Sequence, residues 1–251
     1  MNEREMSVLE HIEELRRRLV IVVVFFLIAF IGGFFLAKPM ILYLQQTDEA
    51  KQLTLNAFRL TDPLFVYLQF AIIIAFVIIF PVILYQLWAF ISPGLYKKEQ
   101  RVTLGYIPIA ILLFLSGISF SYFILFPFII DFMINISNNL DVQQTIGLNE
   151  YFTFLWQLTL PFGILFQLPV VIMFLTRLGI ITPQFLTVSR KYAYFVLLVV
   201  ATLITPPELM SHLLVTVPLL LLYEFSIVIS RFTYRRTLKK QADEEEKEKS
   251  R

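Results

Sequence analysis

Residues 64–91 read LFVYLQFAIIIAFVIIFPVILYQLWAFI, a run of 28 residues without a charged side chain. A helix needs roughly 20 mostly apolar residues, at about 1.5 Å each, to cross about 30 Å of hydrocarbon. This run is therefore long enough to span a membrane with some tilt or bend. It predicts an all-α membrane protein.

The composition of the whole chain supports that prediction. Of the 251 residues, 58% are hydrophobic and 16% are charged, whereas an average globular domain has about 45–50% and about 25%. Phenylalanine alone fills 26 positions. A soluble domain of this size cannot bury so much apolar side chain and keep a wettable surface. Disorder is excluded by the same numbers. We therefore expect a multi-span protein.

Six apolar runs predict six transmembrane helices in one membrane domain, 1–232, followed by a charged tail, 233–251. The last two runs are short and are separated by Thr205-Pro206-Pro207-Glu208, where proline ends the helix. They form a re-entrant hairpin or two short spans. Interior prolines kink several of the runs, which favours a curved, concave bundle. The expected spans are 19–37, 64–91, 102–130, 151–176, 192–204 and 209–229.

The distribution of Lys and Arg predicts the orientation of these spans, because cytoplasmic loops carry the excess of basic residues. Segments 1–18, 92–101, 177–191 and the part of the chain after span six, 230–251, carry 18 of the 21 basic residues. Both termini are therefore expected in the cytoplasm, in a multi-pass protein of the cell membrane. Segment 1–18 contains five acidic residues and is not expected to be a cleaved signal. The net charge of +2 is too small to suggest nucleic-acid binding.

The segments outside the apolar runs are short. Met6–Arg18 has apolar residues at helical spacing and predicts an amphipathic helix that leads into span one. Segment 38–63 is expected to be a loop with one or two brief helices. Segment 131–150 is expected to be a polar, acidic loop. The mixed charges of 243–249 are typical of a solvated helix.

The chain lacks the residues that most kinds of active site require. There is no cysteine, and the two histidines, His11 and His212, fall on opposite sides of the membrane in the predicted topology. No span contains a cluster of acids, and the 8 glycines are too scattered to form a phosphate-binding loop. We expect no catalytic residue, no metal, no cofactor and no enzyme activity.

Two residues inside the predicted spans stand out, because an ionisable or strongly polar group at membrane depth is a functional candidate. Glu224 lies in span six, seven residues before Arg231, and so near the cytoplasmic interface. Gln167 lies near the middle of span four, beside Pro169. The residue alone favours a helix–helix hydrogen bond, worth about 0.6–2 kcal/mol. A proton relay needs several linked acids, which the sequence does not have.

Three acids on the predicted cytoplasmic face have a purely structural interpretation. Glu13 and Glu14 stand four residues before Arg17 and Arg18, a spacing at which each pair stabilises a helix by about 0.2–0.5 kcal/mol. Glu99 is then a solvated charge among lysines. From these residues alone, that interpretation is the stronger one.

Taken together, the motifs of the chain resemble the TatC-type subunit of the twin-arginine protein translocase, from about His11 to Phe232. The 88–99 stretch is highly specific to that family. The motifs that carry the resemblance are His11-Ile12-x-Glu14-Leu15-Arg16-x-Arg18-Leu19; Asp62-Pro63-Leu64-Phe65; Pro81-Val82-x-x-Tyr85-Gln86-x-Trp88-x-Phe90-Ile91-x-Pro93-x-Leu95-Tyr96-x-x-Glu99; Tyr122-Phe123-x-x-Phe126-Pro127; Gly179-Ile180; and Leu203-x-Thr205-Pro206-Pro207.

The resemblance implies a receptor for signal peptides that carry paired arginines, which helps to move folded proteins across the membrane. It implies that Glu14 and Glu99 bind the two arginines, with Arg16 orienting Glu14. Phe90, Leu95 and Tyr96 would contact the hydrophobic residue after the arginine pair. The implied partners are twin-arginine signal peptides, membrane lipids and TatA-type single-span subunits in an oligomeric complex. A separate TatB-type subunit is an open alternative.

One position departs from the family pattern. Many members carry a glutamate in span four where this chain has Gln167. An uncharged amide argues against a charge-based role there and leaves hydrogen bonding to a polar residue of a partner helix. Thr205 and Glu208 match the family pattern by position and are also expected to contact a partner helix or to shape the turn.

Two other functions remain open from the sequence. A small-solute secondary transporter would need a central polar site beyond Gln167, and the chain shows neither an internal repeat nor intramembrane acids in support of one. A purely structural membrane scaffold would need neither Glu14 nor Glu99.

Overall fold

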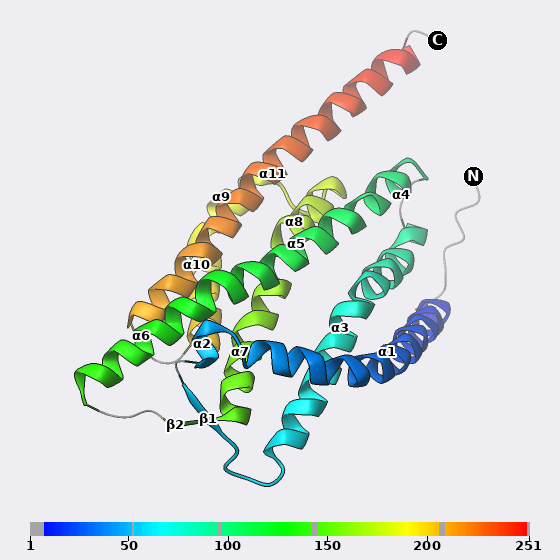
Figure 1. Ribbon diagram of the computed structural model, residues 1–251. Coiled ribbons are helices and arrows are strands. Elements are labelled where there is room, and N and C mark those ends of the chain that lie inside the picture. The colour runs from blue at the N-terminus through cyan, green and yellow to red at the C-terminus, as the bar shows by residue number, and fades with distance from the viewer. Residues whose placement is uncertain (1–7, 52, 95–96, 142–144, 206–208, 250–251) are drawn as a thin grey trace. The chain divides into compact units, whose positions relative to one another are not determined.

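The computed structural model describes all residues except 1–7, 52, 95–96, 142–144, 206–208 and 250–251, and its described part is almost entirely helical (Figure 1). For residues 8, 9, 49, 97–99, 101, 209, 237 and 239–249 it describes the backbone alone. The elements are α1 (Val8–Leu44), α2 (Asp48–Lys51), β1 (Thr54–Asn56), α3 (Asp62–Ile91), a 3₁₀ turn (Ser92–Gly94), α4 (Lys97–Leu104), α5 (Tyr106–Phe120), a π-helical segment (Ser121–Leu125), α6 (Phe126–Asn139), β2 (Thr145–Gly147), α7 (Leu148–Leu165), α8 (Leu168–Arg177), α9 (Pro183–Val188), α10 (Arg190–Ile204) and α11 (Leu209–Lys249).

Five helical stretches of the described residues are long and apolar enough to cross a membrane. They correspond to five of the six predicted runs. The sixth run, 192–204, lies in α10, whose 15 residues make roughly 22 Å of helix. The count of six spans therefore stays a prediction. The five stretches are Glu10–Leu44, Asp62–Gly94, Val102–Asn139, Leu148–Arg177 and Met210–Arg236.

The chain forms two compact units. One contains Met1–Ile111 with Met133–Phe154, and the other contains Leu112–Phe132 with Leu155–Arg251. In the first unit α1 packs along α3. Small residues allow this close approach, since Ala37 of α1 and Ala71 and Ala75 of α3 are fully buried. A Cβ atom added to Gly33 would lie only 2.6 Å from the backbone oxygen of Ala71.

Helix α1 is longer than the sequence predicted at its C-terminal end. The amphipathic N-terminal segment and span one form a single helix of 37 residues, which passes Pro39 and ends at Leu44. The apolar run stops at Lys38 because lysine is charged. A charge does not interrupt backbone hydrogen bonding, so the helix continues. The loop predicted at 38–63 therefore begins only after Leu44, seven residues later than expected, and it contains α2 and β1.

A small two-stranded sheet caps the first unit at the Leu44 end of α1. β1 and β2 pair in parallel, with Leu55 opposite Ile146. The buried Asp62 carboxylate holds the turn before α3 by accepting hydrogen bonds from the backbone N–H groups of Phe58 (3.0 Å) and Arg59 (2.8 Å). Beside β1 lies an open cavity of about 450 Å³. It is lined by Gln45, Ala50, Lys51, Leu53, Leu55, Ala57 and Leu148.

Two of the predicted elements have different limits in the structure. Segment 131–150, expected to be a loop, is helical as far as Asn139 in α6. Span four, expected to be continuous over 151–176, is broken between α7 and α8 at Phe166 and Gln167. Pro169 explains the break, because it has no N–H to bond the carbonyl four residues earlier.

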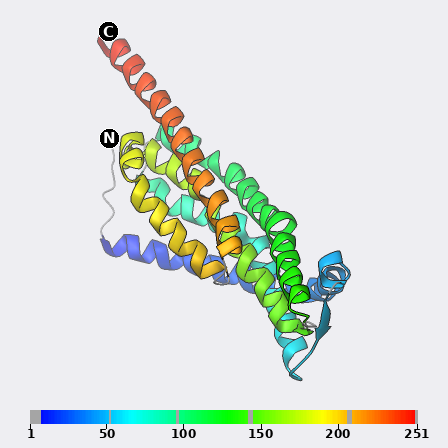
Figure 2. The same ribbon diagram turned by 90° about the vertical axis from the view of Figure 1, so that its left-hand side faces the viewer.

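In the second unit, α8, α9 and α10 pack against α11. α8 ends in a Schellman motif, in which Ile180 N–H bonds the Leu175 carbonyl and Gly179 takes a φ of +72°. The hydroxyls of Thr176 and Ser230 then link α8 to α11 at 2.8 Å. α11 is one unbroken helix of 41 residues (Figure 2). The predicted tail therefore continues the last span as helix up to Lys249.

Candidate functional site

The first turns of α1 carry a half-buried ion pair. Glu14 and Arg18 are four residues apart and so lie on one face of the helix. The Arg18 guanidinium donates from Nε (3.1 Å) and from Nη2 (2.5 Å) to the same oxygen, Oε1 of Glu14. The two side chains are only 21% and 22% exposed. This pair is therefore better shielded from solvent than an ordinary surface pair.

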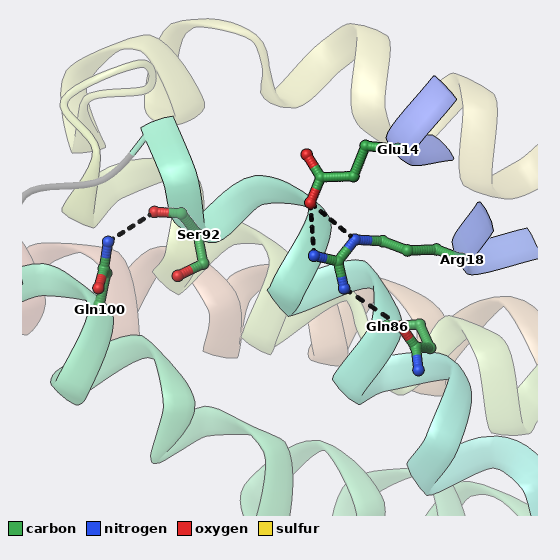
Figure 3. Close-up of polar contacts among 5 residues, drawn as sticks. All are labelled: Glu14, Arg18, Gln86, Ser92 and Gln100. Atoms are coloured by element: carbon green, nitrogen blue, oxygen red, sulfur yellow. Dashed lines mark hydrogen bonds and ion pairs between the residues drawn. The ribbon is translucent and has the colours of Figure 1, made fainter. Parts of the chain in front are cut away.

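Two contacts join this part of α1 to the end of α3. Arg18 Nη1 donates to Oε1 of Gln86 at 3.2 Å, so that Arg18 lies between Glu14 and α3 (Figure 3). Two turns earlier on α1, the His11 ring stacks on Phe90, with centroids 4.3 Å apart and an angle of 27°. Because Gln86 and Phe90 are one turn apart on α3, the two contacts fix one face of α1.

The same end of α3 also holds α4, the helix that carries Glu99. Trp88 Nε1 donates to the hydroxyl of Thr103 at 3.1 Å. Gln100 Nε2 donates to the backbone oxygen of Ser92 at 2.9 Å (Figure 3). The segment Gln86–Ser92 is thus bonded to both helices that contain the predicted binding acids.

The structure brings some of the predicted site residues together and leaves others undefined. Glu14 and Phe90 lie at the α1–α3 contact described above. In the structure Arg18, and not Arg16, bonds the Glu14 carboxylate, and Arg16 is exposed; the orienting role expected of Arg16 stays a prediction. Leu95 and Tyr96 lie outside the described residues, and Glu99 is described by its backbone alone.

Sequence reasoning missed the part that Gln86 plays. It predicted the Glu14–Arg18 pair as a structural alternative from the spacing of four residues. Gln86 is 68 residues from Arg18, and a single glutamine near the end of an apolar run carries no sign of its partner. Its place in the Tyr85-Gln86-x-Trp88 motif was the only available signal.

The residues expected to contact a partner helix belong to the second unit. Gln167 stands at the break between α7 and α8. Thr205 ends α10, is 6% exposed, and donates its hydroxyl hydrogen to the Ala201 oxygen at 2.8 Å. Glu208 lies outside the described residues. Their role in partner binding stays a prediction.

Glu224, the ionisable residue noted in span six, links α11 to α10. Its Oε2 accepts a hydrogen bond from Arg190 Nη2 at 2.7 Å, and its Oε1 accepts one from the Tyr194 hydroxyl at 2.5 Å. Both oxygens are therefore engaged within the chain. Within the described residues, no group of three or more His, Cys, Asp or Glu residues is placed to hold a metal ion.

Comparisons with known proteins agree with this architecture. A family model described as Sec-independent protein translocase protein (TatC) matches residues 10–218. The chain belongs to the TatC family. It is 67% identical to the Sec-independent protein translocase protein TatCy of Bacillus subtilis (strain 168), over 96% of this chain and 95% of that protein. It is 63% identical to a TatC of Halalkalibacterium halodurans, over 95% and 94% of the two chains.

A solved TatC structure shares the fold. The crystal structure of the twin-arginine translocase receptor TatC aligns with a TM-score of 0.79 at 35% identity, covering 89% of this chain and 99% of that chain. The predicted family and all-α membrane fold are confirmed. This TatC is a multi-pass membrane component of the Sec-independent protein translocase, and the small-solute transporter has no support.

Proposed function

We propose that this TatC binds twin-arginine signal peptides at the cytoplasmic face of the cell membrane, with Glu14 and Glu99 as the acids that bind the arginine pair. With TatA-type single-span subunits, and a TatB-type subunit where one exists, it exports folded proteins. A relative of known structure is described as a twin-arginine translocase receptor, which supports the assignment.

The observation that carries this proposal is the shared anchoring of two helices. α1 is bonded to α3 through Arg18 and Gln86, and α4 is bonded to α3 through Thr103 and Trp88. Each of the anchored helices carries one of the two acids. A binding site needs its charged groups on rigid elements, and both acids are on helices fixed to the same end of α3.

The chemistry of a carboxylate pair suits this ligand. A guanidinium is planar and permanently charged, and it presents parallel N–H groups that match a carboxylate at two points. Lysine has a compact ammonium group and cannot copy that geometry. The surrounding Lys and Arg residues repel cations that lack the matching shape. Phe90, Leu95 and Tyr96 supply apolar contact for the hydrophobic residue after the arginines.

The proposed orientation rests on the distribution of charge. The segments placed in the cytoplasm carry 18 of the 21 Lys and Arg residues, and excess basic charge marks the cytoplasmic side. Glu14 then lies near the cytoplasmic end of α1. This places the acids where a precursor protein presents its signal peptide before transport.

We further propose that Gln167, Thr205 and Glu208 contact a partner helix. Gln167 lies at a helix break, where backbone groups lose their regular partners and side-chain amides hydrogen-bond across helices. Much of the apolar surface of α1 is left for lipids and partner helices to cover. Only 6% of its most apolar stretch is buried, and Phe35 is 75% exposed.

The test is site-specific cross-linking of a twin-arginine signal peptide to the intact translocase. Glu14→Gln and Glu99→Gln are each expected to reduce cross-linking at least tenfold, because an amide cannot form the charge-assisted pair. Glu13→Gln is the matched control, since Glu13 is exposed on the same helix turn and should cross-link normally. Normal cross-linking by both acid variants would show that the assigned site is wrong, as a purely structural scaffold predicts.

A further inference from the structure

The Glu14 carboxylate is already bound to a guanidinium of its own chain. Its Oε1 accepts two N–H bonds from Arg18, at 3.1 and 2.5 Å. Its Oε2 is buried, and no hydrogen-bond partner for it is found among the described residues. The acid assigned to the signal peptide is therefore not a vacant receptor in this structure.

This arrangement constrains how a second arginine can bind. A guanidinium that binds a carboxylate with two parallel bonds uses both carboxylate oxygens. Oε1 is taken by Arg18, and Oε2 has no accessible surface. An incoming guanidinium cannot form both bonds until Arg18 releases Oε1 and the carboxylate turns.

Arg18 has a second acceptor ready when it leaves. Its Nη1 already donates to Oε1 of Gln86 at 3.2 Å, from α3 (Figure 3). After release, the Arg18 guanidinium keeps this hydrogen bond and does not become a half-buried charge without an acceptor, which would be costly. The stacking of His11 on Phe90 keeps α1 on α3 during the exchange.

We propose that Arg18 is an internal competitor for Glu14, so that signal-peptide binding exchanges one guanidinium for another. The inference rests on the proposed function, in which Glu14 binds the arginine pair. An arginine of the peptide restores the bonds that Arg18 gives up. A lysine restores fewer and without the fork geometry, so it displaces Arg18 less readily. The internal pair therefore lowers the affinity of Glu14 for any incoming cation by the same factor, and an arginine recovers more of that loss than a lysine.

The experiment compares two peptides on the purified, intact translocase. One fluorescent signal peptide carries the arginine pair, and the other carries lysine at both positions. We expect Arg18→Gln to bind the twin-arginine peptide about tenfold more tightly than the wild type, because no internal guanidinium has to be displaced. The twin-lysine peptide should gain by a similar factor, because the competitor is common to both ligands. Arg17→Gln is the control, because it removes the same charge from an exposed neighbour and should leave both affinities close to those of the wild type.

Unchanged or weaker twin-arginine binding in Arg18→Gln would overturn the inference, because Arg18 would then only support Glu14. If Arg18→Gln fails to fold, Arg18→Lys makes the same comparison with the charge retained. It should also bind the twin-arginine peptide more tightly, because an ammonium holds Oε1 without a fork and is displaced more easily; unchanged or weaker binding by this variant also overturns the inference. Glu14→Gln separates the two claims: normal binding by that variant removes the proposed role of Glu14 itself.

Discussion

Two adjacent glycines of α1 lie in opposite environments. Gly33 is buried against α3, where an added Cβ atom would lie 2.6 Å from the oxygen of Ala71 and 3.4 Å from the nitrogen of Ala75. A Cβ atom at Gly32 would have no neighbour within 4 Å. Only Gly33 is therefore required by the packing of α1 on α3, although the sequence shows the two residues as equivalent.

This contrast gives a prediction at the level of one methyl group. Gly33→Ala should destabilise the protein by about 1–3 kcal/mol, because the Ala71 backbone has to move. Gly32→Ala should be neutral or stabilising by up to about 1 kcal/mol, because alanine favours the helix. The check is the thermal-unfolding midpoint of each variant in detergent. Equal midpoints for the two variants would contradict the close approach.

Individual contacts of the candidate site differ in how well the sequence predicts them. The Glu14–Arg18 pair follows from a spacing of four residues on a helix. The role expected for Arg16 came from family resemblance; in the structure Arg18 bonds the Glu14 carboxylate and Arg16 is exposed. Gln86 was not predictable in this role, since its bond to Arg18 depends on the tertiary packing of α1 on α3.

At the scale of elements, the short helix α10 is held to α11 by a compact polar network. Arg190 and Tyr194 are four residues apart on α10 and both bind the Glu224 carboxylate of α11. One turn before Arg190, the carbonyl of Leu186 in α9 accepts a hydrogen bond from the Tyr223 hydroxyl at 2.9 Å. These bonds hold α9 and α10 on α11. Both helices are too short to be held by a long packing surface.

A double-mutant cycle tests the network. Tyr194→Phe removes one hydrogen bond to a charged acceptor and should cost about 1.5–3 kcal/mol. In a Glu224→Ala background, the same change should cost almost nothing, because the acceptor is gone. Tyr192→Phe is the control, since Tyr192 is 76% exposed on the same helix. The measurement is denaturant unfolding in detergent. Additive costs would show that Tyr194 and Glu224 do not interact.

Apolar run length predicted the main helices well, and their breaks and ends poorly. The break at Gln167 follows from the missing N–H of Pro169. From the sequence alone, however, a proline at this position predicts a kinked helix as well as it predicts a broken one. The predicted end of α1 was wrong because Lys38 ends the apolar run but does not interrupt the backbone hydrogen bonds of the helix. The β1–β2 pair joins Thr54 to Thr145, and strands of three residues are too short to show alternation.

At the scale of the whole molecule, the membrane topology rests on charge and apolar length. The five apolar stretches leave α10 as the uncertain crossing, because its 15 residues cover roughly 22 Å. The six-span count, the cytoplasmic termini and the curved bundle stay predictions. The absence of cysteine makes a direct test simple, because each introduced thiol is then unique.

Single cysteines at three exposed positions distinguish the topologies. Asn139→Cys, at the end of α6, should react with a membrane-impermeant maleimide in intact cells. Gln184→Cys, in α9, should react only after the membrane is opened. Met210→Cys, at the start of α11, should react from outside if α10 crosses. Labelling of Met210→Cys only in opened cells would mean that α10 does not cross the membrane and that the chain has five spans.

The unbroken course of α1 has a mechanical consequence. Its 37 residues make a shaft about 55 Å long, with Glu14 near one end and the cap of α2, β1 and the open cavity at the other. No loop lies between them, and its interior proline, Pro39, lies near the far end. A twist or axial pull applied at Glu14 is therefore expected to reach the other end of α1, so that the two ends of this helix move together.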